Sequence, residues 1–567
     1  MQGRDGAGAA ERYARELRGY SEQILREWQG TSTWKPGEQL RAVSLMSSRD
    51  YAGRFLLELL QNGHDAHPAD RTDGQVHVLL DETEGPHGTL YVANGGRPFG
   101  WQQVERICKL AQSDKRVGDG IGNKGLGFRS VLEIAESPEV YSDGPDGPGS
   151  RSGGGLDGYR FRFATPEDLR VLLGDDALAE RAAKEFPPLQ LPFPVDELPP
   201  TCAELSALGH VTVVRLGLRS DVAHQAAVRR LEELAGARTP VMLFLRRLGG
   251  LVLEHRTADG STDRVDLVRE ERPVARDRPE VPGTGERPSA PAVSVVRVDL
   301  GAAGEFLVAR GTLPGLRLRA TLDEAVAEGS LDESWLDWRE VAEVEAALPT
   351  GAEASQRGQL YTFLPLGGDV AAPLRGHVNA PFFTKMDRTD LDREHPLNAM
   401  LFDALAETCL LAAERWRSLP GAGHRAAAVD VVAWETGARA GGLLAAAAER
   451  VHGCAFAEVP LVPVLEEGAA AWTTPQRAVL WPTGEFAALS AEAAGAAGIP
   501  VADPSRRRSA AAAGTGVHLA EVLPGADVDG AGRVRREDRR AAAPARPRRA
   551  GRDLGRRLRR PRGALRG

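Results

Sequence analysis

Cysteine is scarce in this sequence, and long apolar stretches are missing from it. The 567 residues include four cysteines with no CxxC pair among them, so the spacing fits neither a disulfide framework nor a zinc finger. We expect these thiols to be buried and reduced. No run of about 18 apolar residues occurs, which predicts no membrane span. The first 29 residues are interrupted by Arg, Asp and Glu, unlike a secretory signal peptide, and these absences together predict a cytoplasmic protein.

The sequence also lacks the composition of a disordered or repetitive protein. It has 64 glycines and 37 prolines in 567 residues, below the share typical of disorder, and no internal repeat is visible. Hydrophobic residues make up 42% and charged residues 26%, as in ordinary globular proteins. The length therefore predicts several domains with at least one large core.

Positive charge is lacking in most of the chain. The formal net charge is −8, but residues 531–567 hold fifteen arginines against three acidic residues, a local balance of +12. The preceding residues therefore carry −20, which argues against phosphate-backbone binding as the main activity. The arginine-rich end predicts a disordered tail, and clustered arginines leave a nucleic-acid-binding arm open as the alternative.

Composition and periodicity divide the chain into five segments. Strands are expected at 75–81, 89–94, 159–163 and 211–218, with helical patterns between them, so the fold class is α/β. We therefore expect a helical N-terminal extension (1–46), an α/β domain (47–220), a second α/β domain with a linker near 269–294 (221–420), the Ala-rich start of a third domain (421–503) and an Arg-rich disordered tail (504–567).

A polar stripe runs along an otherwise apolar helix in the stretch ELLQNGHDA. Glu58, Asn62 and Asp65 are spaced i, i+4 and i+7, so they share one face of a helix expected to begin near Ser47 and end near Ala66. Such a stripe is costly to bury unless a polar ligand fills it. An amide oxygen suits Mg²⁺ and a carboxylate can activate water, so a magnesium–nucleotide site is one interpretation and a solvated helix face is the other.

Two glycine-rich turns follow the polar stripe. The first is ANGG at residues 93–96, at the end of a strand, and the second is GDGIGNKGLGFRS at residues 118–130. Glycine lets backbone N–H groups approach a polyphosphate, and a helix expected over residues 128–134 adds its dipole. The second turn contains GxGxxG without the directly preceding strand of a dinucleotide-binding fold, and it does not match GxxxxGK[ST]. A glycine turn without a ligand is the alternative.

In their order, these motifs resemble those of the GHKL (Bergerat-fold) ATPases, which include heat-shock chaperone ATPases, DNA gyrase, MutL and sensor histidine kinases. The shared features are E-x-x-x-N-x-x-D-A on a helix, a strand ending in a glycine turn, and G-x-x-G-x-G-F. The wording IGNKGLGFRSV is most similar to the sacsin-type branch. The resemblance covers about residues 45–220, and more loosely extends to about 420. It implies a two-layer α/β sandwich that binds ATP and Mg²⁺.

The resemblance also implies roles for individual residues. Glu58 would be the general base, Asn62 the Mg²⁺ ligand, and Asp65 part of the nucleotide pocket. Thr212 matches a strand threonine that supports the adenine site. A mobile lid over residues 113–127 and its flanks would hold the phosphates, through Ser113, Gly122, Lys124, Gly125, Gly127 and Phe128.

One position departs from the family pattern. The second motif usually reads D-x-G-x-G, whereas this sequence has Asn94, Gly96 and Pro98. An amide oxygen can accept a hydrogen bond from adenine, but without charge assistance the bond is about 1 kcal/mol weaker, so we expect weaker nucleotide affinity. In chaperone ATPases a basic residue of the next domain reaches the γ-phosphate, and Lys385 and Arg388 are the candidates here.

Three functions are compatible with these motifs. The first is an ATP-driven, chaperone-like machine that acts on a client or partner protein, with a homodimer as one arrangement. The second is a nucleotide-binding scaffold without hydrolysis, which Asn94 favours and Glu58 opposes. The third is a nucleic-acid-associated, defence-type ATPase, which depends on the arginine-rich end. A sensor histidine kinase is disfavoured because the first histidine, His64, lies within the nucleotide motif.

Overall fold

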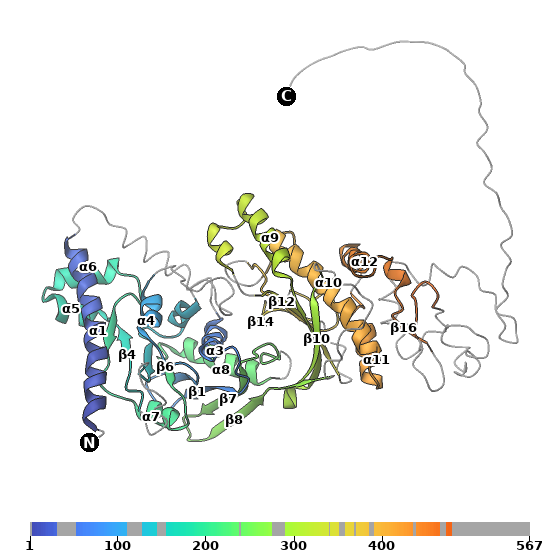
Figure 1. Ribbon diagram of the computed structural model, residues 1–567. Coiled ribbons are helices and arrows are strands. Elements are labelled where there is room, and N and C mark those ends of the chain that lie inside the picture. Colours follow the sequence, from blue (N-terminus) through green and yellow to red (C-terminus); the bar gives the residue numbers. More distant parts are fainter. Residues whose placement is uncertain are drawn as a thin grey trace, which may run out of the picture. The chain divides into compact units, whose positions relative to one another are not determined.

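Two open mixed sheets organise the protein (Figure 1). The computed structural model describes residues 3–30, 53–109, 127–144, 155–236, 240–274, 290–338, 341–350, 358–367, 370–384, 390–434, 438–464 and 472–478. The first sheet has the order β5-β4-β3-β6-β2-β1-β7-β8 and the second the order β14-β13-β15-β12-β11-β10-β9. The expected α/β class is confirmed.

The strands of the first sheet span residues 74–268. They are β1 (Gly74–Asp81), β2 (Thr89–Asn94), β3 (Glu139–Ser142), β4 (Arg160–Phe163), β5 (Pro192–Pro194), β6 (Thr212–Gly217), β7 (Leu248–Arg256) and β8 (Thr262–Val268). All pairings are antiparallel except β1 with β7. The strands expected at 75–81 and 89–94 are therefore confirmed as β1 and β2.

Each face of the first sheet is covered, because apolar residues alternate along its strands. Val76, Val78 and Leu80 of β1 point into a core with α3 (Phe55–Ala66), α4 (Trp101–Cys108), the 3₁₀ helix η1 (Gly127–Glu133) and α8 (Asp221–Ala235). Leu79 points to the other face, where α7 (Pro200–Ala207) packs through Leu205. The sheet thus presents β1 and β2 to the polar stripe helix α3.

The N-terminal helix α1 (Gly3–Gly30) packs along β4 and β5. Tyr13 and Leu17 join the core of the first sheet, and Leu25 contacts a small apolar cluster with α5 (Pro166–Leu173) and α6 (Asp176–Glu185). Of the residues 1–46 expected to form a helical extension, residues 3–30 form this helix. Residues 31–52, with the expected N-cap near Ser47, lie outside the described residues.

The second sheet packs helices on one face and shares a core with the first sheet on the other. Its strands are β9 (Glu270–Pro273), β10 (Ala292–Asp299), β11 (Glu305–Thr312), β12 (Glu343–Pro349), β13 (Leu360–Thr362), β14 (Leu364–Pro365) and β15 (His377–Asn379). Helices α9 (Gly315–Ala327), α10 (Pro396–Arg417), α11 (Ala422–Asp430) and α12 (Ala438–His452) belong to its own core. On the opposite face Phe306, Val308 and Tyr361 join the core of the first sheet, and the Phe244 and Tyr361 ring centroids lie 4.9 Å apart.

The helix α10 lies lengthwise beside this sheet (Figure 1) and is mostly buried. Within the described part of the chain it is long and apolar enough to cross a bilayer, yet 78% of the relevant window is buried inside the protein. These are the properties of a core helix.

Observed elements can be set beside three of the expected segments. The first sheet continues past residue 220, because β7 pairs in parallel with β1 after the crossover helix α8. The linker expected near 269–294 contains β9 and the start of β10. In the Ala-rich segment, α11, α12 and a two-stranded β16–β17 ribbon (Val462–Pro463 and Trp472–Thr473) extend the second domain, since α11 and α12 pack on α10. Residues 479–567 lie outside the described residues.

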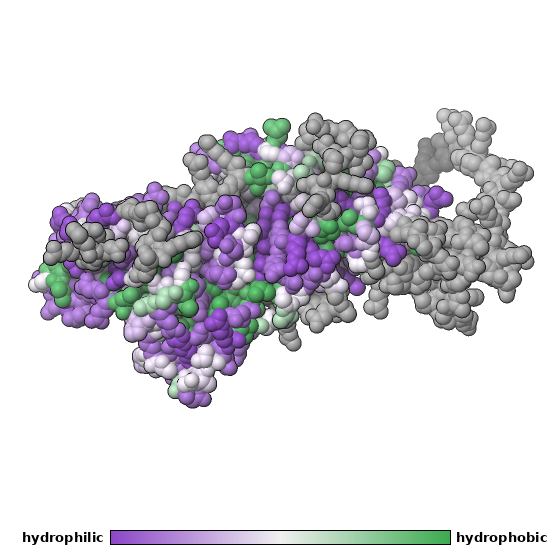
Figure 2. Space-filling model, turned by 60° about the horizontal axis from the view of Figure 1, so that its bottom comes forward, coloured by the Kyte–Doolittle hydropathy of each residue, from purple (hydrophilic) through white to green (hydrophobic). Residues whose placement is uncertain are grey.

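The surface carries few large apolar side chains where it is described. Figure 2 shows hydrophobic patches interleaved with hydrophilic residues on the face that it displays. The large hydrophobic residues that are exposed are Val171, Leu208, Val222, Val265, Val268, Leu316 and Val341. Val265 and Val268 share the strand β8, and the other five lie on separate segments of the chain. Most of the large apolar side chains in the described residues are buried in the cores.

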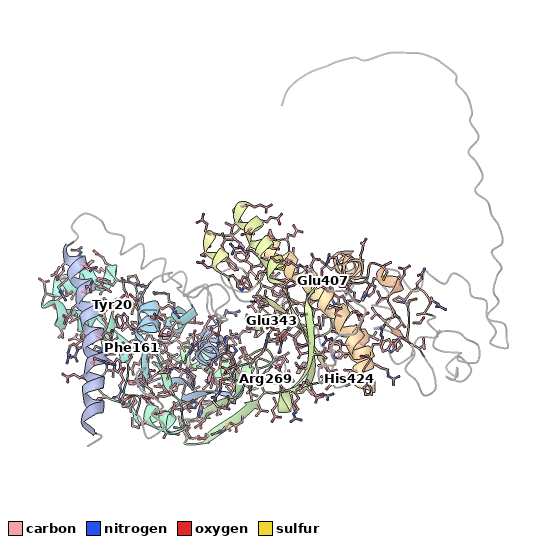
Figure 3. The ribbon with its side chains drawn as sticks, in the orientation of Figure 1. Tyr20, Phe161, Arg269, Glu343, Glu407 and His424 are labelled. Atoms are coloured by element: carbon pink, nitrogen blue, oxygen red, sulfur yellow. The ribbon has the colours of Figure 1, made fainter. Side chains whose placement is uncertain are left out.

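A row of charges crosses the second sheet on the face shared with the first, and within it Glu345 is buried while its arginine partners are partly exposed. Arg310 of β11 lies 2.8 Å from Glu345 of β12, and Asn379 of β15 donates to the same glutamate at 2.8 Å. Arg246 contacts Glu343 at 2.5 Å and Glu345 at 3.4 Å, at the boundary marked by Glu343 in Figure 3. Burial alone would raise the pKa of Glu345, but Arg246 and Arg310 outweigh it and lower that pKa to about 2.

Candidate functional site

The polar stripe of α3 is divided between the core and the surface. Glu58 and Asp65 are 3% and 9% exposed, whereas Asn62, one turn after Glu58, is exposed. The helix lies close to the sheet at Gly63, where a Cβ would come within 2.9 Å of Val76 Cγ2. Asn62 is thus a surface amide next to a buried carboxylate, which a uniformly solvated helix face would not produce.

The carboxylate of Glu58 lies against the end of the glycine-rich loop. A Cβ added at Gly127 would lie 2.2 Å from Glu58 Oε2, so a larger residue there would displace the carboxylate from this position. On the other side, Arg54 Nε is 4.0 Å from Glu58 Oε1. The helix expected over residues 128–134 is observed as the 3₁₀ helix η1, which begins at Gly127, and Phe128 within it is half-buried. Residues 110–126, and with them Ser113, Gly122, Lys124 and Gly125, lie outside the described residues, as do Lys385 and Arg388.

The glycine turn after β2 wraps around the carboxyl end of α3. Gly96 has φ +88°, and a Cβ there would lie 2.6 Å from the carbonyl oxygen of Ala66. Arg97 donates from its backbone N–H to that same carbonyl at 2.8 Å. Its guanidinium, and that of Arg247, donate to the carbonyl oxygen of Asp65 at 3.2 and 3.4 Å. Two positive charges thereby complement the negative end of the helix dipole.

The expected adenine-site residues meet across three neighbouring strands. Asn94 of β2 is paired with Thr212 of β6, and Thr212 is paired with Ser142 of β3. Thr212 Oγ1 and Ser142 Oγ are 3.0 Å apart, and both residues are buried. The Asn94 side chain donates from Nδ2 to the carbonyl oxygen of Gly95 at 2.6 Å. This bond fixes the orientation of the amide, whose Oδ1 is a hydrogen-bond acceptor.

The fold adds residues that the motifs did not indicate. Ser142 was missed, although its hydroxyl also accepts from the Phe99 N–H at 2.9 Å and so fixes the segment after the glycine turn. Arg54 and Arg247 were missed as well. Arg54 stands one helical turn before Glu58, a spacing that could have indicated it, whereas Arg247 reaches α3 only through the tertiary fold.

Replacing Gly96 by alanine should be more damaging than replacing a glycine with similar backbone geometry but free space around it. Both a positive φ and the contact with Ala66 oppose the change, so we expect about 2–4 kcal/mol less free energy of unfolding. Gly209 has φ +98° with nothing within 4 Å of an added Cβ, so Gly209→Ala should cost only the backbone strain, about 1 kcal/mol. Urea denaturation measures both, and equal costs would contradict the close approach.

Histidines gather on the sheet face opposite α3. The His77 and His210 rings lie 5.8 Å apart, and His77 Nε2 is 3.0 Å from Glu254 Oε2. Burial, together with the neighbouring His77 and His67, lowers the pKa of His210 to about 4. The folded state therefore favours the neutral imidazole, and protonation of His210 at low pH lowers the free energy of unfolding.

The free energy of unfolding should fall as the pH falls from about 6.5 to about 4, because the unfolded chain binds the His210 proton in that window and the folded chain does not. At 1.36 kcal/mol per pKa unit, the contribution of His210 is about 3 kcal/mol. The variant His210→Phe should show a pH dependence weaker by this amount, measured by urea denaturation from pH 4 to 7.5. An unchanged slope would contradict the assignment.

The described residues form a mixed α/β protein in which α3 packs against the interior strands β1 and β2 of the first sheet. This helix carries Glu58 next to Gly127 and meets the glycine turn at its carboxyl end. No family model matches the chain. A stretch of 216 residues is 24% identical to Protein NO VEIN of Arabidopsis thaliana. The similarity covers 37% of this chain and only 7% of that much longer protein.

Proposed function

We propose that the first domain binds ATP with Mg²⁺ and hydrolyses the γ-phosphate in the manner of GHKL ATPases of the sacsin and heat-shock chaperone type. The observation that carries this proposal is the position of Glu58, whose carboxylate lies directly against Gly127 while Asn62 stands exposed one turn away. The residues proposed as base, metal ligand and end of the phosphate loop are thus adjacent, which a solvated helix or an unliganded glycine turn does not require.

Glu58 has the surroundings of a general base. It is 3% exposed, so bulk water does not compete for its carboxylate, and the Arg54 guanidinium 4.0 Å away provides a fixed positive charge beside it. In this position Glu58 would accept a proton from the water that attacks the γ-phosphate. The lack of a side chain at Gly127 lets the carboxylate lie at the proposed phosphate loop.

The residues around Asn62 fit a magnesium–nucleotide complex. The side-chain amide offers the hard oxygen that Mg²⁺ prefers, and its exposure leaves room for the waters that this ion retains. Bound Mg²⁺ would neutralise charge on the phosphates. Asp65 is held differently, since its Oδ1 lies 3.1 Å from Nδ1 of His64, so it would shape the pocket from its buried side.

The adenine end is built from neutral groups. Asn94 supplies an acceptor in place of the usual carboxylate, and the Thr212–Ser142 hydroxyl pair lies on the strands next to it. The Gly96 turn brings backbone next to this end. Without a charged acceptor, we expect a modest affinity for ATP, set by the phosphates and Mg²⁺ more than by the base.

A link from this site to the second sheet favours an ATP-driven conformational role over a passive scaffold. Arg247 donates to the carbonyl oxygens of Asp65 and His67 at the end of α3, while the adjacent Arg246 contacts Glu343 and Glu345 of β12. A movement of α3 on nucleotide binding would therefore alter the contacts that Arg246 makes with β12 of the second domain. We propose that this movement acts on a client or partner protein.

The test is Mg²⁺-ATP binding by calorimetry and phosphate release on the full chain, with Asn62→Ala beside Asn62→Asp. We expect saturable binding and slow turnover in the wild type, at least about tenfold weaker Mg²⁺-dependent binding in Asn62→Ala, and retention in Asn62→Asp, which keeps an oxygen ligand. Binding without turnover would favour the scaffold. No binding at millimolar ATP would overturn the proposal.

A further inference from the structure

Two histidines and a glutamate converge outside the nucleotide site. Glu82 directly follows β1, His224 lies in the first turn of α8, and His255 lies near the end of β7. Nε2 of each histidine is 2.9 Å from the same oxygen, Oε1 of Glu82. The three donor atoms all lie within 4.8 Å of one another. Residues separated by up to 173 positions are thus aimed at one point by three different elements.

We propose that Glu82, His224 and His255 form a binding site for a divalent transition metal of the Zn²⁺ class. Two imidazole nitrogens and one carboxylate oxygen are a donor set that proteins use for zinc with a fourth position left to water. This mixture of nitrogen and oxygen donors favours Zn²⁺ over Mg²⁺ or Ca²⁺, which prefer oxygen alone. The site is therefore chemically distinct from the one around Asn62.

The positions of the donors allow the ion to enter with small movements. Ligands at about 2.0–2.1 Å from a tetrahedral ion are roughly 3.3 Å apart, close to the separations of 2.9 Å between Glu82 Oε1 and each imidazole. The side chains of His224, Glu82 and His255 are 29%, 20% and 20% exposed, so the cluster is open to solvent. A neutral imidazole can move its proton to Nδ1 and present the Nε2 lone pair to the ion.

The glutamate is held in place from outside the cluster. The N–H of Ala258, in the β7–β8 turn, donates to Glu82 Oε2 at 2.9 Å, and the N–H of Glu82 itself donates to the carbonyl oxygen of Arg256 at 2.9 Å. Supporting bonds of this kind orient metal ligands. A bound ion would fasten the β1–β2 turn, α8 and the β7–β8 hairpin to one another.

Direct metal titration of the full chain, freed of any histidine tag and treated with chelator, tests the proposal. We expect one Zn²⁺ per chain with a micromolar or tighter Kd, and a visible Co²⁺ spectrum of the intense tetrahedral type. His224→Ala and His255→Ala should each weaken Zn²⁺ binding by at least about 100-fold. His87→Ala is the matched control, because His87 pairs with Asp221 on the same turn of α8 and is not part of the cluster.

The alternative is a hydrogen-bonded cluster that holds no metal, and the experiment separates the two. Wild-type protein that binds neither Zn²⁺ nor Co²⁺ at micromolar concentration would overturn the proposal, whatever the variants do. Equal affinity in wild type and in a His224→Ala/His255→Ala double variant would also overturn it, since the metal would then be bound elsewhere, for instance by thiols. Should the alanine variants fail to fold, Glu82→Gln, which keeps the side-chain shape, should still lower the affinity and the Zn²⁺-dependent rise in unfolding temperature.

Discussion

Replacing Glu58 by glutamine is expected to stop ATP turnover while leaving nucleotide binding intact. Glutamine keeps the size and the polar end of the side chain, so the close contact with Gly127 is preserved. It cannot accept the proton of the attacking water, and loss of a general base typically costs a factor of about 10² to 10⁴ in rate. Because the phosphates are strongly negative, removing the carboxylate should leave ATP affinity equal or somewhat higher.

The comparison is made by phosphate release under saturating Mg²⁺-ATP and by calorimetric titration of the same preparations. Glu185→Gln is a suitable control, since Glu185 is also buried but is bonded to Trp28 and Arg181 on α1 and α6, away from α3. It should turn over ATP like the wild type. If Glu58→Gln keeps its rate within about threefold of the wild type, the carboxylate is not the base.

The elements that form the site were predictable because each is marked by local sequence. The run of apolar residues in β1 and the i, i+4, i+7 polar spacing in α3 are visible without knowledge of the fold. The glycines of the turn after β2 predict a backbone conformation that residues with a side chain rarely adopt, and Gly96 has the positive φ expected of it. Local patterns therefore sufficed for the helix, the two strands and the glycine turn after the second strand.

Local sequence patterns could not predict which residues distant in the sequence contact these elements. The strand β7 lies beyond the boundary expected at residue 220, and only its parallel pairing with β1 places it in the first sheet. Arg247 and Ser142 take part in the site because β7 and β3 bring their neighbourhoods to α3 and to Thr212. Glu82, His224 and His255 share no motif spacing, so the sequence gives no sign of their convergence.

The largest effect on stability should come from removing Arg310. Glu345 is 1% exposed, and Arg310 Nε lies 2.8 Å from its Oε1. Arg310→Met keeps much of the side-chain volume but leaves the buried carboxylate with less compensation, which typically costs about 3–5 kcal/mol. Arg272→Met is the matched control. Arg272 also pairs with a glutamate, Glu270, but both side chains are more than 60% exposed, so the cost should be below about 1 kcal/mol.

Two further measurements decide whether the uncompensated carboxylate of Glu345 causes the loss of stability in Arg310→Met. Adding Glu345→Gln to Arg310→Met should recover part of the lost stability, since no buried carboxylate then remains unpaired. The second measurement is the pH dependence of the free energy of unfolding. The pKa of Glu345 is lowered from 4.5 to about 2, so its contribution is complete above pH 4.5 and is lost as the pH falls towards 2. The difference between wild type and Arg310→Met should therefore narrow below pH 4.5. A double variant less stable than Arg310→Met would instead mean that Glu345 is held mainly by Arg246 and Asn379.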